Sequence, residues 1–195
     1  MSVTVVKKTK FAPCPWAKGE AYLAYHDNEW GVPCYDDQRL FEKLCLEGQQ
    51  AGLSWITVLN KRQHYRQCFH QFDAEKIAAM RDDELENYLQ DSGLIRNRLK
   101  IFAIRKNAQA YLAMCEQGES LAELVWRFVG GKPQVNHFAS MHEVPAETAA
   151  SQAMSKALKR RGFTFVGPTI CYAFMQSMGL VNDHLIHCPQ HPVNR

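Results

Sequence analysis

The amino-acid sequence predicts an all-α protein. From Asp36 onward, apolar residues recur at helical spacing along most of the chain, and residues that favour helix starts precede several of these stripes. No segment alternates apolar and polar residues over enough positions to predict a β-strand. The chain has 195 residues, of which 46% are hydrophobic and 22% are charged. It is therefore long enough for one domain with a real core.

The first strong helical stripe begins near Asp36 or Asp37, either of which can cap a helix, and it ends near Gly48. Ser54 is suited to cap the next helix. Residues 130–146 contain glycine and proline and are expected to form a connection. The same pattern predicts further helices over residues 73–80, 82–93, 97–115, 120–129, 147–162 and 168–179.

Charge and cysteine content limit the compartment and the partner. The net charge of +3 permits a polyanionic partner without requiring one. Seven scattered cysteines indicate reduced thiols rather than a disulfide framework, so we expect a cytoplasmic protein. No apolar run reaches the ~18 residues of a membrane span, and we expect a monomer without a membrane partner. Residues 1–12 are predicted to form a basic, mobile tail without a secretion signal, and residues 189–195 a C-terminal tail.

Residues 152–179 predict two helices joined by a tight turn that contains Gly162 and Gly167. Pro168 suits the first turn of the second helix, whose free N–H groups can bind a phosphate. Basic side chains lie beside this turn, at Lys156, Lys159, Arg160 and Arg161. The turn is therefore a candidate contact for nucleic acid, and an ordinary helical hairpin with a solvated basic face is the alternative.

Residues 22–55 concentrate large flat side chains around one carboxylate, Glu47, and one histidine, His26. The aromatic members of this stretch are Tyr22, Tyr25, Trp30 and Trp55. Such a group can line a pocket for a flat, electron-poor ligand. The alternative is that these aromatic residues belong to the core.

Cysteine and histidine occur at both ends of the sequence in a combination that zinc accepts. His184 and Cys188 are four residues apart, so both can face one ion from a helical turn. Cys14 and His26 lie near the other end of the chain, and their separation exceeds that of a zinc-finger knuckle. Spacing alone therefore leaves open that the pair His184 and Cys188 is incidental.

Several uncommon strings occur in one order: YHDNEWGVP, LEGQQAGLSWITVL, GLIRNR, RGFTFVGPTICYAFMQ and GLVNDH. Together they resemble the DNA-3-methyladenine glycosylase I family, within the helix–hairpin–helix superfamily of DNA glycosylases, over about residues 14–188. The resemblance implies a helix–hairpin–helix glycosylase-like domain over residues 13–188, with two lobes. It also implies an enzyme of base excision repair, which flips 3-methyladenine out of alkylated double-stranded DNA and hydrolyses its N-glycosidic bond.

The resemblance also implies roles for individual residues. A structural zinc ion on Cys14, His26, His184 and Cys188 would pin the N-terminus to the C-terminus. His187 and His191, two further histidines nearby, are expected on the surface. Four donors from the protein would leave no open position for a reacting water.

In the implied pocket, Tyr25 and Trp55 would sandwich the flipped base, and Tyr22 and Trp30 would complete the wall. Glu47 would contact the edge of the base and is the candidate catalytic residue. Burial and the negative end of its helix are expected to disfavour the ionised carboxylate. The alternative for Glu47 is a helix-end carboxylate paired with a lysine or arginine.

The implied contacts with DNA involve a wedge and a turn. Gly52 and Leu53 would fill the gap that the flipped base leaves, and the alternative is that Leu53 belongs to the core. Gly162, Gly167 and Pro168 would contact the DNA backbone.

The sequence departs from the superfamily pattern where Val181 is often followed by a catalytic aspartate. Here Asn182 occupies that position and Asp183 follows it. No lysine follows the hairpin where strand-cutting members carry one, so an abasic site without a nick is expected. The missing aspartate leaves open a non-catalytic reader of alkylated bases, and the Cys/His set leaves open a zinc hydrolase.

Overall fold

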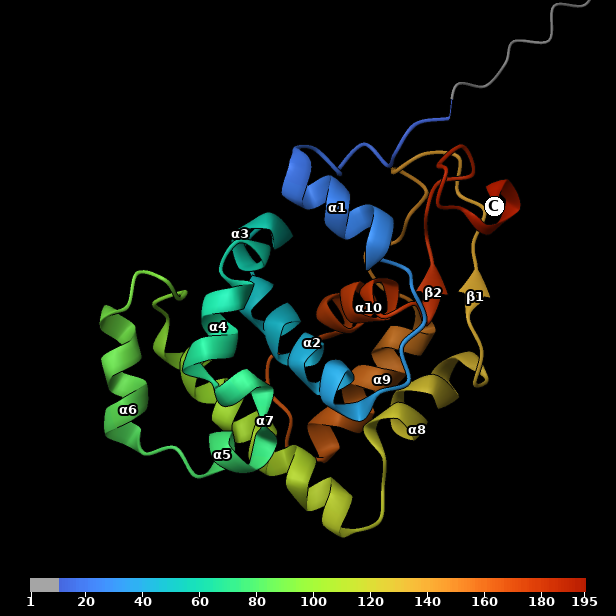
Figure 1. The fold of residues 1–195 in the computed structure, drawn as a ribbon. Coiled ribbons are helices and arrows are strands. Elements are labelled where there is room, and N and C mark those ends of the chain that lie inside the picture. The colour runs from blue at the N-terminus through green and yellow to red at the C-terminus, as the bar shows by residue number, and fades with distance from the viewer. Residues whose placement is uncertain (1–10) are drawn as a thin grey trace, which may run out of the picture.

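The computed structural model describes residues 11–195, which fold mostly into helices (Figure 1). The α-helices are α1 (Glu20–Asn28), α2 (Asp37–Gln50), α3 (Trp55–Leu59), α4 (Arg62–Cys68), α5 (Ala74–Ala78), α6 (Asp82–Asn87), α7 (Arg98–Glu116), α8 (Leu121–Trp126), α9 (Ala149–Arg160) and α10 (Pro168–Ser177). Short 3-10 turns are η1 (His70–Phe72), η2 (Tyr88–Gln90), η3 (Arg127–Val129) and η4 (Pro192–Asn194). The prediction of a helical fold is confirmed. Most of the predicted tail, residues 1–10, lies outside the described residues.

Two strands of two residues each were not predicted. β1 (Gln134–Val135) pairs in parallel with β2 (Val181–Asn182), with Gln134 opposite Val181. A two-residue strand is too short to show an alternating pattern, so its sequence carries no signal. The pairing attaches the connection before α9 to the segment after α10.

Local capping explains where several helices begin. The carboxylate of Asp36 accepts a hydrogen bond from the Arg39 amide at the start of α2, as predicted. The predicted cap at Ser54 is wrong in detail. Ser54 precedes α3, but its hydroxyl lies 3.0 Å from the Thr57 hydroxyl and makes no bond to a helical amide.

Helix α2 lies in the middle of the molecule (Figure 1). Helices α4–α7 lie on one side of it, while α1, α8, the strands and the C-terminus lie on the other. Helix α2 packs against α3, α7, α8 and α10. Within residues 11–195 we find no helix with the length and hydropathy that a bilayer crossing requires.

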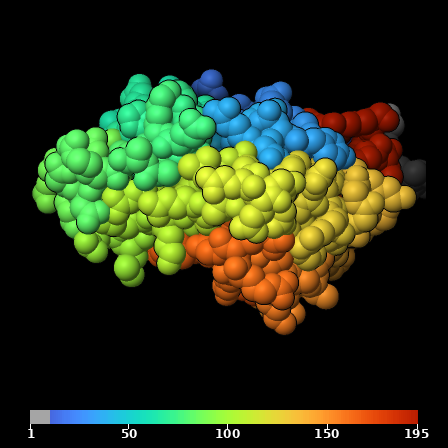
Figure 2. Space-filling model, turned by 90° about the horizontal axis from the view of Figure 1, so that it is seen from below, coloured from blue at the N-terminus to red at the C-terminus, as the bar shows by residue number. Residues whose placement is uncertain are grey.

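Helices α9 and α10 form the predicted hairpin, with Pro168 as the first residue of α10. Gly162 has φ +92°, which glycine adopts without strain, but Gly167 has φ −64°. Of these two glycines in the turn, only Gly162 therefore has the left-handed conformation that favours glycine. Figure 2 shows α9 and the turn after it, coloured orange, projecting from the surface formed by α7 and the segment that follows α7.

The end of α10 approaches the chain that follows α1 very closely. Gly179 has φ +70°, and a Cβ atom on it would lie 2.4 Å from the Pro33 nitrogen. The Cys34 amide donates to the Met178 carbonyl at 3.1 Å across the same contact. Only glycine fits both the backbone conformation and the space at position 179.

We expect Gly179→Ala to lower the free energy of unfolding by at least about 3 kcal/mol, because overpacking adds to the cost of a left-handed residue. Gly118→Ala is the matched control, since Gly118 has φ +77° and open space around it. It should cost only about 1–2 kcal/mol. Urea denaturation measures both, and equal costs would contradict the close approach at Gly179.

Candidate active site and metal centre

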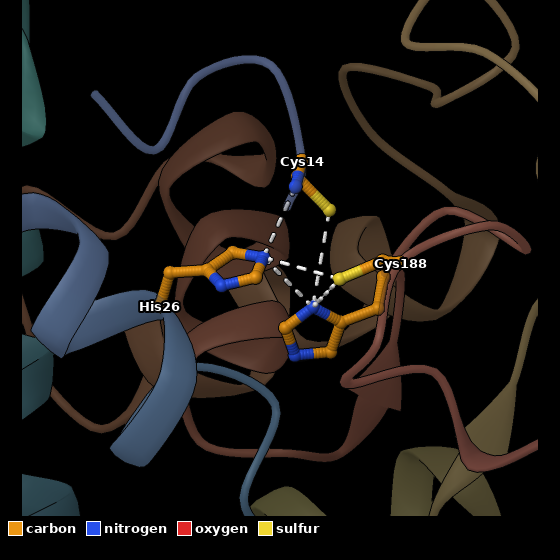
Figure 3. A group of neighbouring side chains, drawn as sticks. Cys14, His26 and Cys188 are labelled. Atoms are coloured by element: carbon orange, nitrogen blue, oxygen red, sulfur yellow. Dashed lines mark hydrogen bonds between the residues drawn. The ribbon is translucent and has the colours of Figure 1, made fainter. Parts of the chain in front are cut away.

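Two cysteines and two histidines from distant parts of the chain converge in one buried cluster (Figure 3). Its members are Cys14, His26, His184 and Cys188. The Cys188 sulfur lies 3.4 Å from His26 Nε2 and 3.5 Å from His184 Nδ1. The Cys14 sulfur lies 3.8 Å from His184 Nδ1, and the two histidine nitrogens are 3.2 Å apart. Donors around a tetrahedral zinc ion are about 3.3–3.8 Å apart, so this spacing fits one ion.

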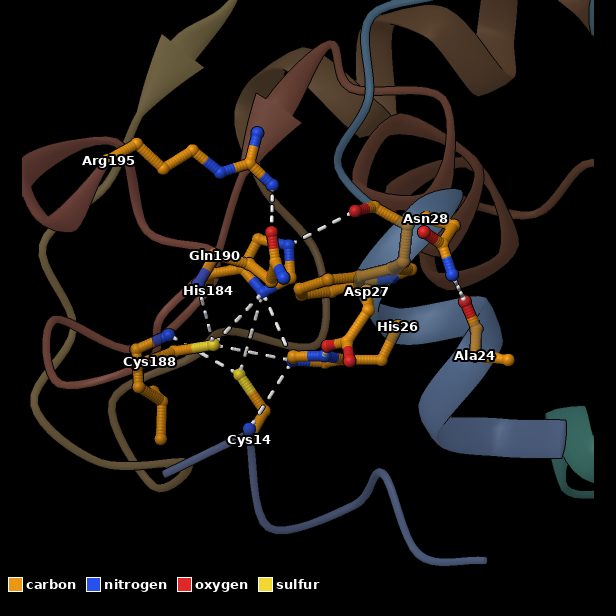
Figure 4. Close-up of polar contacts among 11 residues, drawn as sticks. Cys14, Ala24, His26, Asp27, Asn28, His184, Cys188, Gln190 and Arg195 are labelled. Carbon is orange, nitrogen blue, oxygen red and sulfur yellow. Dashed lines mark hydrogen bonds and ion pairs between the residues drawn. The ribbon is translucent and has the colours of Figure 1, made fainter. Parts of the chain in front are cut away.

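The surroundings of the cluster orient its donors. Asp27 lies 2.7 Å from His26 Nδ1, and the Trp30 carbonyl lies 3.1 Å from His184 Nε2 (Figure 4). These contacts leave the other nitrogen of each ring for an ion, an arrangement that is common around bound metals. Backbone amides also donate to both sulfurs, which favours thiolates: Leu185 to Cys14 and Gln190 to Cys188.

A hydrogen bond couples the two thiols of the cluster. The hydrogen bond from Cys14, together with those from both histidines, holds the pKa of Cys188 well below its usual value. The same bond to Cys188 and burial raise the pKa of Cys14. One sulfur is therefore disposed to be a thiolate, which is the form that binds a metal ion. The cluster can hold a metal ion, and it brings the segment before α1 against the segment after β2.

The prediction that His191 lies on the surface is wrong. His191 is fully buried, with Nε2 2.9 Å from the Asn136 carbonyl and Nδ1 accepting from the Val193 amide. These contacts occupy both ring nitrogens, and His191 is not among the clustered donors. Its main partner lies 55 residues away in the sequence, where periodicity gives no signal.

A cavity of about 220 Å³ opens beside the cluster. It is lined by Trp16, Tyr22, Tyr25, Trp30, Glu47, Gln50, Trp55, Met141, Val144, Ala173, Gln176 and Asp183. All five residues predicted for the pocket are present. Its volume is below the ~300 Å³ at which pockets for drug-sized ligands begin, so it suits a small flat molecule.

Trp16 belongs to the aromatic wall and was missed, because it lies outside the aromatic stretch that the sequence emphasised. Its ring centroid is 4.9 Å from that of Tyr22 and 5.0 Å from that of Trp30. Trp30 in turn lies edge-on to His184, with 4.6 Å between ring centroids. The wall of the pocket therefore packs directly on the Cys/His cluster.

Tyr25 and Trp55 do not bracket an open slot. Their ring centroids are 5.5 Å apart with 40° between the planes, whereas a sandwiched base needs about 7 Å, twice the ~3.5 Å contact distance. The Lys43 ammonium lies 3.3 Å from the centre of the Trp55 ring. The two rings therefore leave no room for a third ring between them in this structure.

Glu47 is 2% exposed and lies in the last turn of α2. Its Oε1 atom pairs with the Lys43 ammonium at 3.2 Å. Its Oε2 atom has no hydrogen-bond partner among residues 11–195, and neither does Trp55 Nε1. The alternative of a helix-end carboxylate paired with lysine is therefore observed, together with a place in the pocket.

Asp183 lines the pocket, whereas the superfamily position Asn182 does not. Asp183 is buried, and both of its oxygens are engaged. Oδ2 accepts from the Tyr172 hydroxyl at 2.6 Å and from Gln176 at 2.9 Å, while Oδ1 accepts from Asn136 at 2.7 Å. This carboxylate is held by three donors from two parts of the chain, α10 and the segment after β1. Only the single-residue offset in the sequence suggested it.

Among the residues predicted to contact DNA, Gly52, Leu53 and Gly162 are exposed, whereas Gly167 and Pro168 at the start of α10 are half-buried. Leu53 is 42% exposed, so the alternative that it belongs to the core is wrong. Gly52 has φ +74° with open space around it. Lys100 supports this turn by donating to the carbonyls of Gln49 and Ala51. At the hairpin, Lys156, Lys159 and Arg160 are exposed, while Arg161 pairs with Glu119.

The chain is similar to known proteins in both sequence and structure. The family model described as methyladenine glycosylase matches residues 16–191. The DNA-3-methyladenine glycosylase 1 of Escherichia coli K12 is 57% identical over 183 residues, which are 93% of this chain and 98% of that protein. A crystal structure of a 3-methyladenine DNA glycosylase I superposes with a TM-score of 0.92 at 59% identity, over 93% of this chain and 100% of the other.

A further solved structure, of a variant 3-methyladenine DNA glycosylase I in complex with 3-methyladenine, is 34% identical with a TM-score of 0.88. The match covers 92% of this chain and 97% of that one. The resemblance indicated by the sequence motifs is confirmed over nearly the whole chain. This chain belongs to the methyladenine glycosylase family.

Proposed function

We propose that this protein is a DNA-3-methyladenine glycosylase of base excision repair. It removes 3-methyladenine from alkylated double-stranded DNA by hydrolysing the N-glycosidic bond. The observation that carries the proposal is the buried, unpartnered oxygen Glu47 Oε2 inside an aromatic cavity. Buried polar atoms are nearly always hydrogen-bonded, so an exception in a pocket marks the place of a ligand donor. The relatives named above support the same conclusion.

The aromatic wall suits the chemistry of the lesion. In DNA, 3-methyladenine carries a delocalised positive charge, which weakens its bond to the sugar and makes the base a good leaving group. Aromatic faces attract such a ring, and Trp16, Tyr22 and Trp30 offer theirs. The base has to leave the helical stack to reach them. Because the base leaves readily, the pocket needs to bind and orient it and does not need a strong acid.

Glu47 gives the pocket its preference for adenine. Oε2 accepts a hydrogen bond from the exocyclic amino group of the base. Guanine presents a carbonyl oxygen at the equivalent edge, and two acceptors facing each other would leave both unpaired in a buried site. Glu47 is therefore the residue to which we assign recognition and the candidate catalytic role.

For DNA, we assign the gap left by the flipped base to Leu53 on its exposed turn. The amides at the start of α10, beside Gly167 and Pro168, would hold a phosphate together with the exposed basic residues of α9. No lysine is among the described residues that line the cavity, since Lys43 lies behind Glu47. The product is therefore an abasic site in an unbroken strand. The monomeric state and cytoplasmic location remain predictions.

The ion of the Cys/His cluster is proposed to be zinc in a structural role. Two sulfurs and two imidazoles form the donor set of closed structural zinc sites, with no position for a reacting water. The zinc hydrolase alternative requires such a position.

Incubation with methylated duplex DNA should release 3-methyladenine and leave 7-methylguanine in place, without strand breaks. Chromatography of the released bases and denaturing electrophoresis of the strands measure both outcomes. A protein that binds the methylated duplex and releases no base would be a reader of alkylated bases, contrary to the proposal.

Glu47→Gln should lower single-turnover base release by about 10–100-fold, the loss expected for a charge-assisted hydrogen bond of about 1.5–3 kcal/mol. Lys43 would take the amide oxygen of the introduced side chain and leave an N–H group in place of Oε2. Unchanged release by a folded variant would remove Glu47 from the chemistry and direct attention to Asp183.

Loss of a zinc ligand should destabilise the fold. Cys188→Ser is expected to abolish stoichiometric zinc binding and to lower the thermal midpoint by roughly 10 °C, at about 2–4 °C per kcal/mol for a protein of this size. Cys115→Ser is the control, because Cys115 is exposed and outside the cluster. Elemental analysis and calorimetry provide the measurements. If a chelator abolished activity and left the thermal midpoint unchanged, the zinc hydrolase alternative would be favoured.

A further inference from the structure

Lys43 is a lysine buried behind the carboxylate that recognises the base. It is 6% exposed and lies one helical turn before Glu47 on α2. Its ammonium lies 3.2 Å from Glu47 Oε1 and donates to the Tyr25 hydroxyl at 2.8 Å. It also lies 3.3 Å from the centre of the Trp55 ring. An ammonium has three N–H groups, and these three neighbours account for all of them.

Such contacts are the ones that a buried charge needs. An unpaired ammonium in an apolar interior is very costly, while a paired and hydrogen-bonded one can persist. A ring face adds a favourable cation–π contact when the cation is desolvated. With three partners from α1, α2 and α3, the Lys43 head group is fixed in place, and so is the oxygen of Glu47 that it binds.

Other charged groups act on Lys43 from the neighbouring elements. Glu29, which follows α1, favours the ammonium and Arg62 of α4 opposes it, but these two form a pair with each other at 2.5 Å and 2.8 Å. Arg39 of α2 lines a cavity of about 40 Å³ beside Lys43. Burial lowers the pKa of Lys43 to about 8, and the Glu47 carboxylate raises it. Near neutral pH, Glu47 is therefore the main countercharge of a mostly protonated Lys43.

We propose that Lys43 is a positioning residue for Glu47: it keeps the carboxylate ionised, engages Oε1 and leaves Oε2 free to accept a hydrogen bond from the base. This role rests on the proposed function. It makes Lys43 a determinant of specificity, because only an ionised carboxylate presents an acceptor to an amino group without also offering an O–H donor. A protonated Glu47 could donate to a carbonyl and would accept guanine more readily.

Lys43→Met tests the role, since methionine has a similar length and no charge. Without the ammonium, burial disfavours the ionised carboxylate, so Glu47 would become protonated at a higher pH. The acid limb of the pH profile of kcat/KM for 3-methyladenine release should move up by at least one pH unit. Activity at pH 6 should fall at least tenfold relative to wild type, and most of it should return at pH 8.

Two control variants distinguish a positioning role of Lys43 from a general loss of activity. Lys106→Met removes the same charge from an exposed position on α7 and should leave the profile unchanged. Lys43→Arg keeps the positive charge, with the adjacent cavity for the larger head group, and should keep the acid limb where wild type has it. If Lys43→Met were slower by the same factor at every pH, Lys43 would have no positioning role.

A measurement on the wild-type protein keeps the proposal testable if Lys43→Met does not fold. With 13C-labelled glutamate carboxyl groups, the Glu47 signal is the one that Glu47→Gln removes. In the wild-type protein, the Glu47 signal should keep the chemical shift of an ionised carboxylate throughout pH 5.5–8. A titration midpoint of this signal within that range would overturn the proposal. This result is independent of base release, so failure of the proposed function and failure of this inference are distinguishable.

Discussion

A carboxylate held inside an apolar core is the constraint on which the rest of the site depends. Nine of the fourteen residues of α2, including Lys43 and Glu47, are buried, and the helix is packed on several sides by other helices. Burial of a lone charge costs several kcal/mol even after relaxation, so the carboxylate requires its countercharge nearby. Lys43 supplies that charge one turn earlier on the same helix. Because Lys43 and Glu47 lie on the same helix, the geometry of the pair does not depend on movements of other elements.

The Cys/His cluster supports the opposite wall of the pocket. His26 and His184 pack against Trp30, and Trp16 follows Cys14 by two residues, so the donors of the cluster and the aromatic wall share the same short segments. An ion bound by all four donors would therefore fix the ring positions as well as the two ends of the described chain. This arrangement explains how a protein without a long sheet or a disulfide among its described residues can present a rigid aromatic surface. The pocket lies between two anchored parts: α2 with its charge pair, and the terminal segments with their donors.

Local and regional features could be predicted from the sequence, whereas single long-range contacts could not. Helical periodicity and caps such as Asp36 are encoded within a few residues, so most helices after Asp36 were predicted. Helix α1 was not predicted, because it precedes the periodic part of the sequence. The aromatic residues and Glu47 occupy one stretch, and the Cys/His set carries a recognisable chemistry. By contrast, the engagement of Asp183 by Asn136 and the burial of His191 depend on packing between segments about 50 residues apart. The contact between the rings of Tyr25 and Trp55 depends on the angle between two helices, which no spacing specifies.

The binding of free 3-methyladenine tests whether Glu47 Oε2 accepts a hydrogen bond from the base. Calorimetric titration of wild type and Glu47→Gln at neutral pH isolates recognition from bond cleavage. We expect binding to wild type and about 10–100-fold weaker binding to the variant, because a charge-assisted hydrogen bond contributes about 1.5–3 kcal/mol. Equal affinities for the two proteins would show that the aromatic wall alone binds the base, and would contradict the role assigned to the buried carboxylate.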